Sequence, residues 1–125
     1  MTEQEVQEIY KRLLELTKAG KIRWEKTSST EFTTNFSRSS VTVEKEGLLT
    51  GKHVALKIYN DVGLMVAYAA NSTGLDFIVG TGVKEFKLDP SELYAFIQEN
   101  LYKYSETTKS ILDELKELEL SQKGN

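Results

Sequence analysis

The amino-acid sequence predicts an α+β fold in a single domain that spans residues 1–125. Apolar residues recur with helical spacing over 1–20, alternate with a period of two over 21–88, and return to helical spacing over 89–120. A run of strands between two helices is typical of helices that cover one face of an antiparallel sheet. A chain of this length can bury a hydrophobic core without disulfides or metals.

The first helix is expected to begin at Thr2 and to end before Gly20. Thr2 and Glu5 have the spacing of a capping box, in which a hydroxyl and a carboxylate each accept a hydrogen bond from an otherwise unpaired backbone N–H. Gly20 occupies the place where a residue with a left-handed backbone would end the helix. The apolar face consists of Val6, Ile9, Tyr10, Leu13, Leu14 and Thr17. This amphipathic helix needs a surface to cover.

Five or six half-buried antiparallel strands are expected between residues 21 and 88. The alternating positions are Ile22 and Trp24, then Phe32, Thr34 and Phe36, then Val41 and Val43, then Val54, Leu56 and Ile58. Turn residues at 60–63 predict one hairpin, and the glycine-containing segment 46–52 predicts another. The segments 75–79 and 83–88 are further candidate strands.

The last helix has the clearest start signal in the chain, the run Asp89-Pro90-Ser91-Glu92. Asp89 suits the N-cap, Pro90 suits the first helical position because its missing N–H has no partner there, and Glu92 completes a capping box. We expect one helix over 89–120, roughly 45 Å long at 1.5 Å per residue. Strands span only about 20 Å, so half of this helix would overhang the sheet. The alternative is a break near Ser105, after which the second half folds back.

A stripe along this helix predicts an oligomerisation face. Its members follow one another at alternating spacings of three and four residues, as in helices that pack along a partner. The stripe consists of Tyr94, Ile97, Leu101, Tyr104, Thr108, Ile111, Leu115 and Leu118. Because its second half would overhang the sheet, we expect the residues from Ile97 onward to mediate a homo-oligomer, most simply a dimer.

Composition argues against several classes of function. The chain contains no cysteine, hence no disulfide, thiolate nucleophile or cysteine metal site, and a reducing, cytoplasmic location is expected. The sequence shows neither the basic start of a signal peptide nor an apolar run long enough for a membrane span. A net charge of −3 argues against general affinity for nucleic acid. Residues 18–57 nevertheless hold eight Lys or Arg against four Glu, whereas 88–125 hold four Lys against eight Asp or Glu.

The sequence offers little for catalysis, so no catalytic residue, metal ligand or cofactor is expected. His53 is the only histidine, which excludes a zinc site with two histidines, and we interpret it as an exposed loop residue. Glu114, Glu117 and Glu119 are interpreted as a solvated helix face rather than an acid–base pair. The run Gly80-Thr81-Gly82 lacks the other positions of a phosphate-binding loop and indicates a turn.

One hydroxyl-rich stretch has the composition of an anion site. Nine of the fourteen residues over 27–40 are Ser or Thr, and cationic and aromatic residues lie among or beside them. Guanidinium and hydroxyl groups bind phosphate, and aromatic rings stack on bases. The candidate ligand residues are Arg23, Trp24, Lys26, Thr34, Phe36, Ser37 and Arg38. The simpler interpretation is an ordinary solvated strand face, since Thr favours strands and the aromatic residues alternate as core residues do.

The run from Leu13 to Glu25, with the letters LLELTKAGKIRWE and a Ser/Thr-rich strand start after it, resembles the opening of small bacterial and phage proteins of helix-then-sheet type. It covers about a fifth of the chain and implies no functional residues. Small, acidic, cysteine-free proteins of this kind are similar to accessory proteins of mobile elements, including inhibitors of host defence and proteins that sequester signalling nucleotides.

Two functions follow as expectations. The first is a non-enzymatic binding protein that captures a small anionic, nucleotide-like ligand, as an anti-defence sequestering protein of a phage or mobile element would. The alternative is an adaptor or inhibitor that binds another protein through the acidic last helix or a sheet edge.

Overall fold

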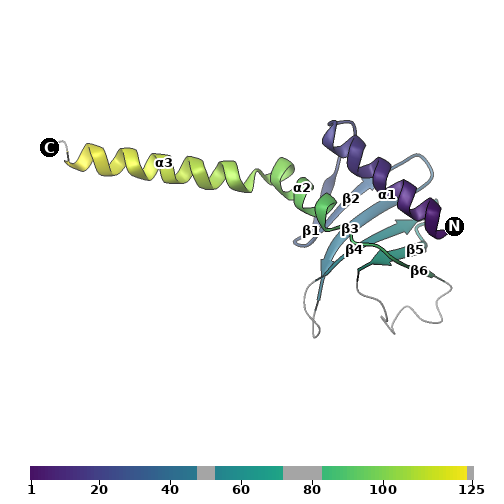
Figure 1. Ribbon diagram of the computed structural model, residues 1–125. Coiled ribbons are helices and arrows are strands. Elements are labelled where there is room, and N and C mark those ends of the chain that lie inside the picture. Colours follow the sequence, from purple (N-terminus) through teal and green to yellow (C-terminus); the bar gives the residue numbers. More distant parts are fainter. Residues whose placement is uncertain (48–52, 72–82, 124–125) are drawn as a thin grey trace.

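The computed structural model describes residues 1–47, 53–71 and 83–123. Figure 1 shows two layers, a sheet and the helices on one of its faces, with a further helix that projects from the domain. The elements are α1 (Glu3–Lys18), β1 (Glu25–Ser28), β2 (Glu31–Asn35), β3 (Ser40–Glu46), β4 (His53–Tyr59), β5 (Met65–Ala70), β6 (Lys84–Lys87), α2 (Ser91–Tyr102) and α3 (Tyr104–Lys123). The predicted α+β class is confirmed.

The six strands lie in the sheet in chain order, from β1 at one edge to β6 at the other. Neighbours from β1 to β5 are antiparallel, as expected, but β6 pairs with β5 in parallel. The expectation of a purely antiparallel sheet is therefore wrong at β6. An alternating pattern reports which face a residue occupies and carries no information about strand direction. The candidate strand 75–79 and the Gly80-Thr81-Gly82 turn lie outside the described residues.

Both ends of α1 follow from local chemistry. The Glu5 N–H donates to Thr2 Oγ1 over 3.2 Å, and the Thr2 N–H donates to Glu5 Oε1 over 2.8 Å, which confirms the capping box. Gly20 has a φ of +73°, and the Gly20 and Lys21 amides donate to the carbonyls of Thr17 and Leu16. This arrangement is a Schellman motif, which glycine favours because it lacks a Cβ.

The β4–β5 hairpin forms at the predicted turn. Asn60 Oδ1 accepts hydrogen bonds from the Val62 and Leu64 amides over 3.1 and 2.9 Å, and Gly63 has a φ of +82°. The expected strand alternation of Ile22 with Trp24 is not part of the sheet, since β1 begins only at Glu25. Residues 19–24 instead form the connection between α1 and β1.

The C-terminal helical segment is not continuous. Lys103 adopts a left-handed backbone with a φ of 51° and separates α2 from α3, so the expectation of one helix over 89–120 is wrong. Nor does the second half fold back, because α3 points away from the domain (Figure 1).

The start of α2 also differs from a full capping box. Asp89 Oδ1 accepts from the Ser91 amide over 3.1 Å, but Glu92 forms an ion pair with Lys18 over 2.6 Å.

The core lies between one face of the sheet and the two helices α1 and α2. Buried side chains from the helices include Val6, Leu13, Leu93, Tyr94 and Ile97, and those from the sheet include Phe32, Val41, Val43, Val54, Leu56, Ile58, Ala67 and Ala69. The rings of Phe32 and Tyr94 meet at 5.3 Å between centroids with a tilt of 56°. Among the described segments, no helix has both the length and the apolar character that crossing a membrane requires.

The predicted stripe divides at the end of this core. Ile97 is 2% exposed and belongs to the core, whereas Leu101 is 45% exposed. Thr108, Ile111, Leu115 and Leu118 all lie on α3 and are exposed. Tyr104 begins α3. The sheet therefore covers only the first part of the stripe.

Candidate functional site

The predicted ligand residues do not converge on one place. Arg23, Trp24 and Lys26 line a cleft between the α1–β1 connection and α2. Phe36 and Arg38 line a separate groove beside α1. We call the first the Trp24 cleft and the second the α1 groove. Both cavities share Lys21 and Ile22, so the α1–β1 connection runs between them.

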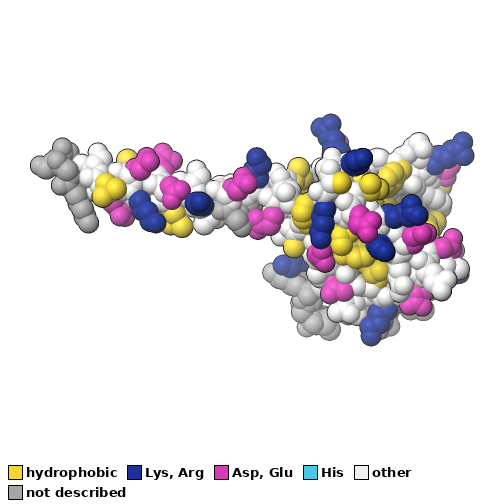
Figure 2. Space-filling view, turned by 45° about the horizontal axis from the view of Figure 1, so that its top comes forward, with side chains coloured by type: hydrophobic (Ala, Val, Ile, Leu, Met, Phe, Trp, Pro, Cys, Tyr) yellow, Lys and Arg dark blue, Asp and Glu magenta, His cyan; other side chains and the backbone are white. Residues whose placement is uncertain are grey.

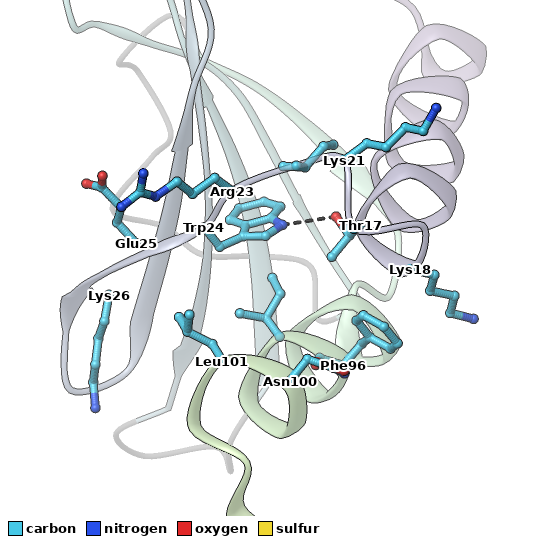
Figure 3. A pocket seen from close by; sticks show the side chains of 13 residues that line it. Thr17, Lys18, Lys21, Arg23, Trp24, Glu25, Lys26, Phe96, Asn100 and Leu101 are labelled. Atoms are coloured by element: carbon cyan, nitrogen blue, oxygen red, sulfur yellow. Dashed lines mark hydrogen bonds between the residues drawn. The ribbon is translucent and has the colours of Figure 1, made fainter.

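The Trp24 cleft has a volume of about 880 Å³ and is open to solvent on one side. Figure 3 shows the Trp24 indole at its centre, with Phe96, Asn100 and Leu101 of α2 facing it from below. A volume of 300–1,000 Å³ is the usual size for a small-molecule site. The cleft combines an apolar floor with polar groups at its rim.

One hydrogen bond holds the indole in place. Trp24 Nε1 donates to Thr17 Oγ1 over 3.0 Å, and both residues are buried, with Trp24 6% exposed. The bond joins the last turn of α1 to the residue that precedes β1. The indole is therefore a fixed, largely buried wall of the cleft, and its N–H is already used.

The charges around the Trp24 cleft are mostly positive. Lys18, Lys21, Arg23 and Lys26 line it together with one acid, Glu25. Lys18 is held by Glu92, and Figure 3 shows Lys18, Lys21 and Lys26 extending away from the indole, with the Arg23 guanidinium on the side of Glu25. Arg23 and Lys21 form no ion pair with any described residue. Because Lys21 extends toward α1 on the other side of the indole, Arg23 is the candidate for holding an anion at the rim.

The α1 groove is more apolar. It encloses about 690 Å³ between α1 and the sheet, and its walls include Ile9, Leu13 and Leu16 on one side and Phe36 and Val66 on the other. The cations that line it are Arg12, Lys21 and Arg38, and no acidic residue of the described chain does so. Arg12 pairs with Glu8 on the exposed side of α1 over 3.3 Å.

The hydroxyl-rich stretch serves mainly the sheet. The hydroxyls of Thr27, Thr33 and Thr42 form a ladder across β1, β2 and β3, with oxygen separations of 3.1 and 3.0 Å. Thr34 points into the core and is 4% exposed. Ser37 is exposed in the β2–β3 turn and lines neither cavity. The structure thus brings neither Thr34 nor Ser37 to the predicted cations Arg23 and Lys26.

Sequence reasoning missed a polar network on the sheet face opposite the helices. Tyr68 OH donates to Glu46 Oε1 over 2.7 Å, His53 Nε2 lies 3.3 Å from the same hydroxyl, and Lys57 Nζ donates to Glu44 Oε1 over 2.5 Å. His53 is the first residue of β4 and its side chain is 13% exposed, so its interpretation as an exposed loop residue is wrong.

The strand register explains this network. Glu46, the last residue of β3, is directly opposite His53, the first residue of β4, and Lys57 is opposite Tyr68 in the β4–β5 pair. The alternation of Glu44 with Glu46 would have been the available signal. Because the Tyr68 proton goes to Glu46, His53 must donate from Nε2 to the tyrosine oxygen. In the described part of the chain, no three His, Asp or Glu residues are placed to hold a metal ion.

The network changes the titration of two of its members. Burial, the hydrogen bond to Glu46 and the negative charge of Glu46 raise the pKa of Tyr68 far above its ordinary value of 10.0. Burial by itself would lower the pKa of Lys57, but the hydrogen bond to Glu44 and the charges of Glu46 and Glu44 outweigh it and raise the pKa.

The Trp24–Thr17 bond predicts a cost for an isosteric substitution. Thr17→Val removes the acceptor and leaves a buried indole N–H without a partner, so the free energy of unfolding should fall by about 1–3 kcal/mol. Urea denaturation followed by circular dichroism measures it. Thr107→Val, at an exposed position of α3, is the matched control and should change stability by less than about 0.5 kcal/mol. Equal losses in both variants would contradict a structural role for this bond.

The raised pKa values predict a loss of stability at alkaline pH. Unfolded tyrosine releases its proton near pH 10, whereas folded Tyr68 keeps it, so stability should fall as pH rises above that value. Lys57 acts in the same direction above its ordinary value of 10.5, because its favourable charge disappears as it deprotonates. Tyr68→Phe should be less stable at neutral pH but should show a shallower alkaline decline. Parallel pH profiles for the two proteins would contradict the assignment.

Comparisons of the chain with protein-family models, with curated proteins and with solved structures find no match. The functional inference therefore rests on the residues and geometry described above.

Proposed function

We propose that this protein is a non-enzymatic binding protein that captures a small anion with a planar apolar part, such as a nucleotide, in the Trp24 cleft. The observation that supports this proposal is the presence of a fixed indole and an arginine without an ion-pair partner in the described chain, Arg23, at one cleft. The planar part of the ligand would lie against Leu101 and the small exposed part of the Trp24 ring, and its phosphate would bind Arg23. A protein that binds such a ligand without transforming it lowers the free ligand concentration, which is a sequestering role.

The choice of the Trp24 cleft over the α1 groove follows from the positions of aromatic and charged groups. Guanidinium binds phosphate through two parallel hydrogen bonds, and Arg23 has no partner in the described chain that would compete. In the α1 groove the aliphatic side chains predominate, and Arg12 is already paired with Glu8. The groove therefore suits an apolar occupant better than a nucleotide.

A ligand screen and one substitution test the proposal. Nucleotides and sugar phosphates that bind only the folded protein must raise its melting temperature. Since Trp24 is the only tryptophan, quenching of its fluorescence reports binding in the cleft directly. Arg23→Ala should weaken the Kd of the best ligand by about ten- to a hundredfold, because charge-assisted hydrogen bonds contribute about 1.5–3 kcal/mol.

The control for this experiment is Arg38→Ala, which removes an equal charge from the α1 groove and should leave the Kd unchanged. Both arginines are exposed, so neither substitution should alter the melting temperature of the free protein by much. The proposal fails if no anion in the screen raises the melting temperature, or if Arg23→Ala and Arg38→Ala bind equally well.

A protein-binding adaptor is the second candidate, and the exposure of α3 favours it. From Glu106 to Gln122 every side chain of this helix is exposed. Charge reversal at Glu106, Asp113 and Glu117 should then abolish binding to a partner protein, whereas Arg23→Ala should be tolerated.

A further inference from the structure

The helix α3 exposes an apolar face that its own domain does not cover. Ile111, Leu115 and Leu118 are between 49% and 61% exposed, and they share one side of the helix with Thr108 and Leu112. Most helical stability in proteins comes from packing of an apolar face rather than from intrinsic propensity. Figure 2 shows α3 as a narrow projection with hydrophobic, acidic and basic side chains along it. The exposed apolar face therefore favours a partner.

A coiled coil between two copies of α3 is a poor solution. Tyr94 and Ile97 are buried in their own domain, so the part of the stripe on α3, from Tyr104 to Leu118, spans only about two heptads, whereas a stable coiled coil sustains three or four. A parallel pair would place Glu114 opposite Glu119 of the second helix, and an antiparallel pair would place the Glu114 side of each helix beside its copy. Like charges meet in both orientations.

The α1 groove has the complementary properties. Leu16 and Phe36, both on its walls, are 43% and 48% exposed, which is unusual for large apolar side chains in contact with a core. In Figure 2 hydrophobic side chains on the rounded domain lie among charged side chains of both signs. The groove is lined by Arg12, Lys21 and Arg38 and, among described residues, by no acid.

We propose that α3 of a second copy of this chain binds in the α1 groove, with Ile111, Leu115 and Leu118 against its apolar walls. Glu114 borders the apolar face of α3 on one side and Glu119 borders it on the other, whereas Lys109 and Lys116 lie farther round the helix. The two acids at the borders of the contact then lie near the cations of the groove, and the lysines face solvent.

The dimensions agree with this arrangement. The apolar segment of α3 from Ile111 to Leu118 and the groove-lining segment of α1 from Ile9 to Leu16 each cover seven residue steps, about 10 Å at 1.5 Å per residue. No residue of α2 lines the groove, and α3 leaves α2 in a direction away from the domain (Figure 1). Docking on a second copy thus needs no reversal of the chain. In a two-fold symmetric dimer, α3 of each copy would bind in the α1 groove of the other, so the contact would form twice.

Sedimentation of the full chain at micromolar concentration tests the proposal, with a dimer as the expected result. Leu115→Glu places a charge in the apolar contact and should weaken the dimer at least about tenfold in Kd. Leu120→Glu is the matched control, because Leu120 is on the opposite side of α3 and is 68% exposed, and it should leave the dimer intact.

Substitutions in the groove separate this arrangement from a contact between two α3 helices. Phe36→Glu and Arg38→Glu should each weaken the dimer at least about tenfold, whereas Val62→Glu, at the exposed hairpin tip outside the groove, should not. The double reversal Glu114→Lys with Glu119→Lys should weaken the wild-type dimer and should restore assembly of Arg12→Glu with Arg38→Glu.

Three outcomes overturn the proposal. The first is a monomeric wild-type protein, which is also the result expected if α3 docks on its own domain. The second is a dimer that Leu115→Glu disrupts but Phe36→Glu and Arg38→Glu do not. The third is that the variants with reversed charges on α3 and in the groove form no dimer together, although circular dichroism shows that both are folded.

Discussion

The structure depends on the limited extent of a single apolar sheet face. α1 and α2 lie side by side on this face, and their buried residues Val6, Leu13, Leu93 and Ile97 complete the core. Ile97 is the last residue of the predicted stripe that the sheet covers. The apolar side chains of the stripe that follow Ile97 must therefore pack against another partner or remain exposed to water. The left-handed Lys103, the projecting α3 and its exposed apolar side all follow the end of this surface. A positive φ at a non-glycine residue costs about 1–2 kcal/mol, so the change of direction is not a neutral continuation of α2.

The short connection between α1 and β1 organises both cavities. The Schellman motif at Gly20 turns the chain, and the Trp24–Thr17 hydrogen bond ties its far end back to α1. The connection therefore has a defined path, with the Trp24 cleft on one side and the α1 groove on the other. Lys21 contributes to both. Two sites of different character result, one aromatic and cationic, the other aliphatic with a cationic rim, and they suit different occupants.

The two faces of the sheet differ in how their side chains are stabilised. The face under the helices is apolar apart from Thr34, whereas the opposite face pairs its polar groups across strands. Thr27, Thr33 and Thr42 form one hydroxyl ladder, and Tyr68, Glu46 and His53 form a hydrogen-bonded cluster. No buried side-chain nitrogen or oxygen in the described chain lacks a hydrogen-bond partner. Thr27 and Thr33 of the hydroxyl-rich stretch 27–40 thus pair across strands, which is a structural role for these two side chains.

Local sequence determined the ends of α1, the β4–β5 turn and the alternation of β2, β3 and β4, because caps, turns and periodicity act over a few residues. It also indicated that the second half of the C-terminal stripe would overhang the sheet. Tertiary structure alone decided the parallel β6 and the distribution of cations, whereas the break at Lys103 lies two residues from the alternative break that the sequence indicated near Ser105. Arg23 and Arg38 are only fifteen positions apart, yet the α1–β1 connection separates their cavities. His53 became part of a cluster only because the β3–β4 register places it opposite Glu46. Composition lists the groups that could bind an anion, but packing determines which of them meet.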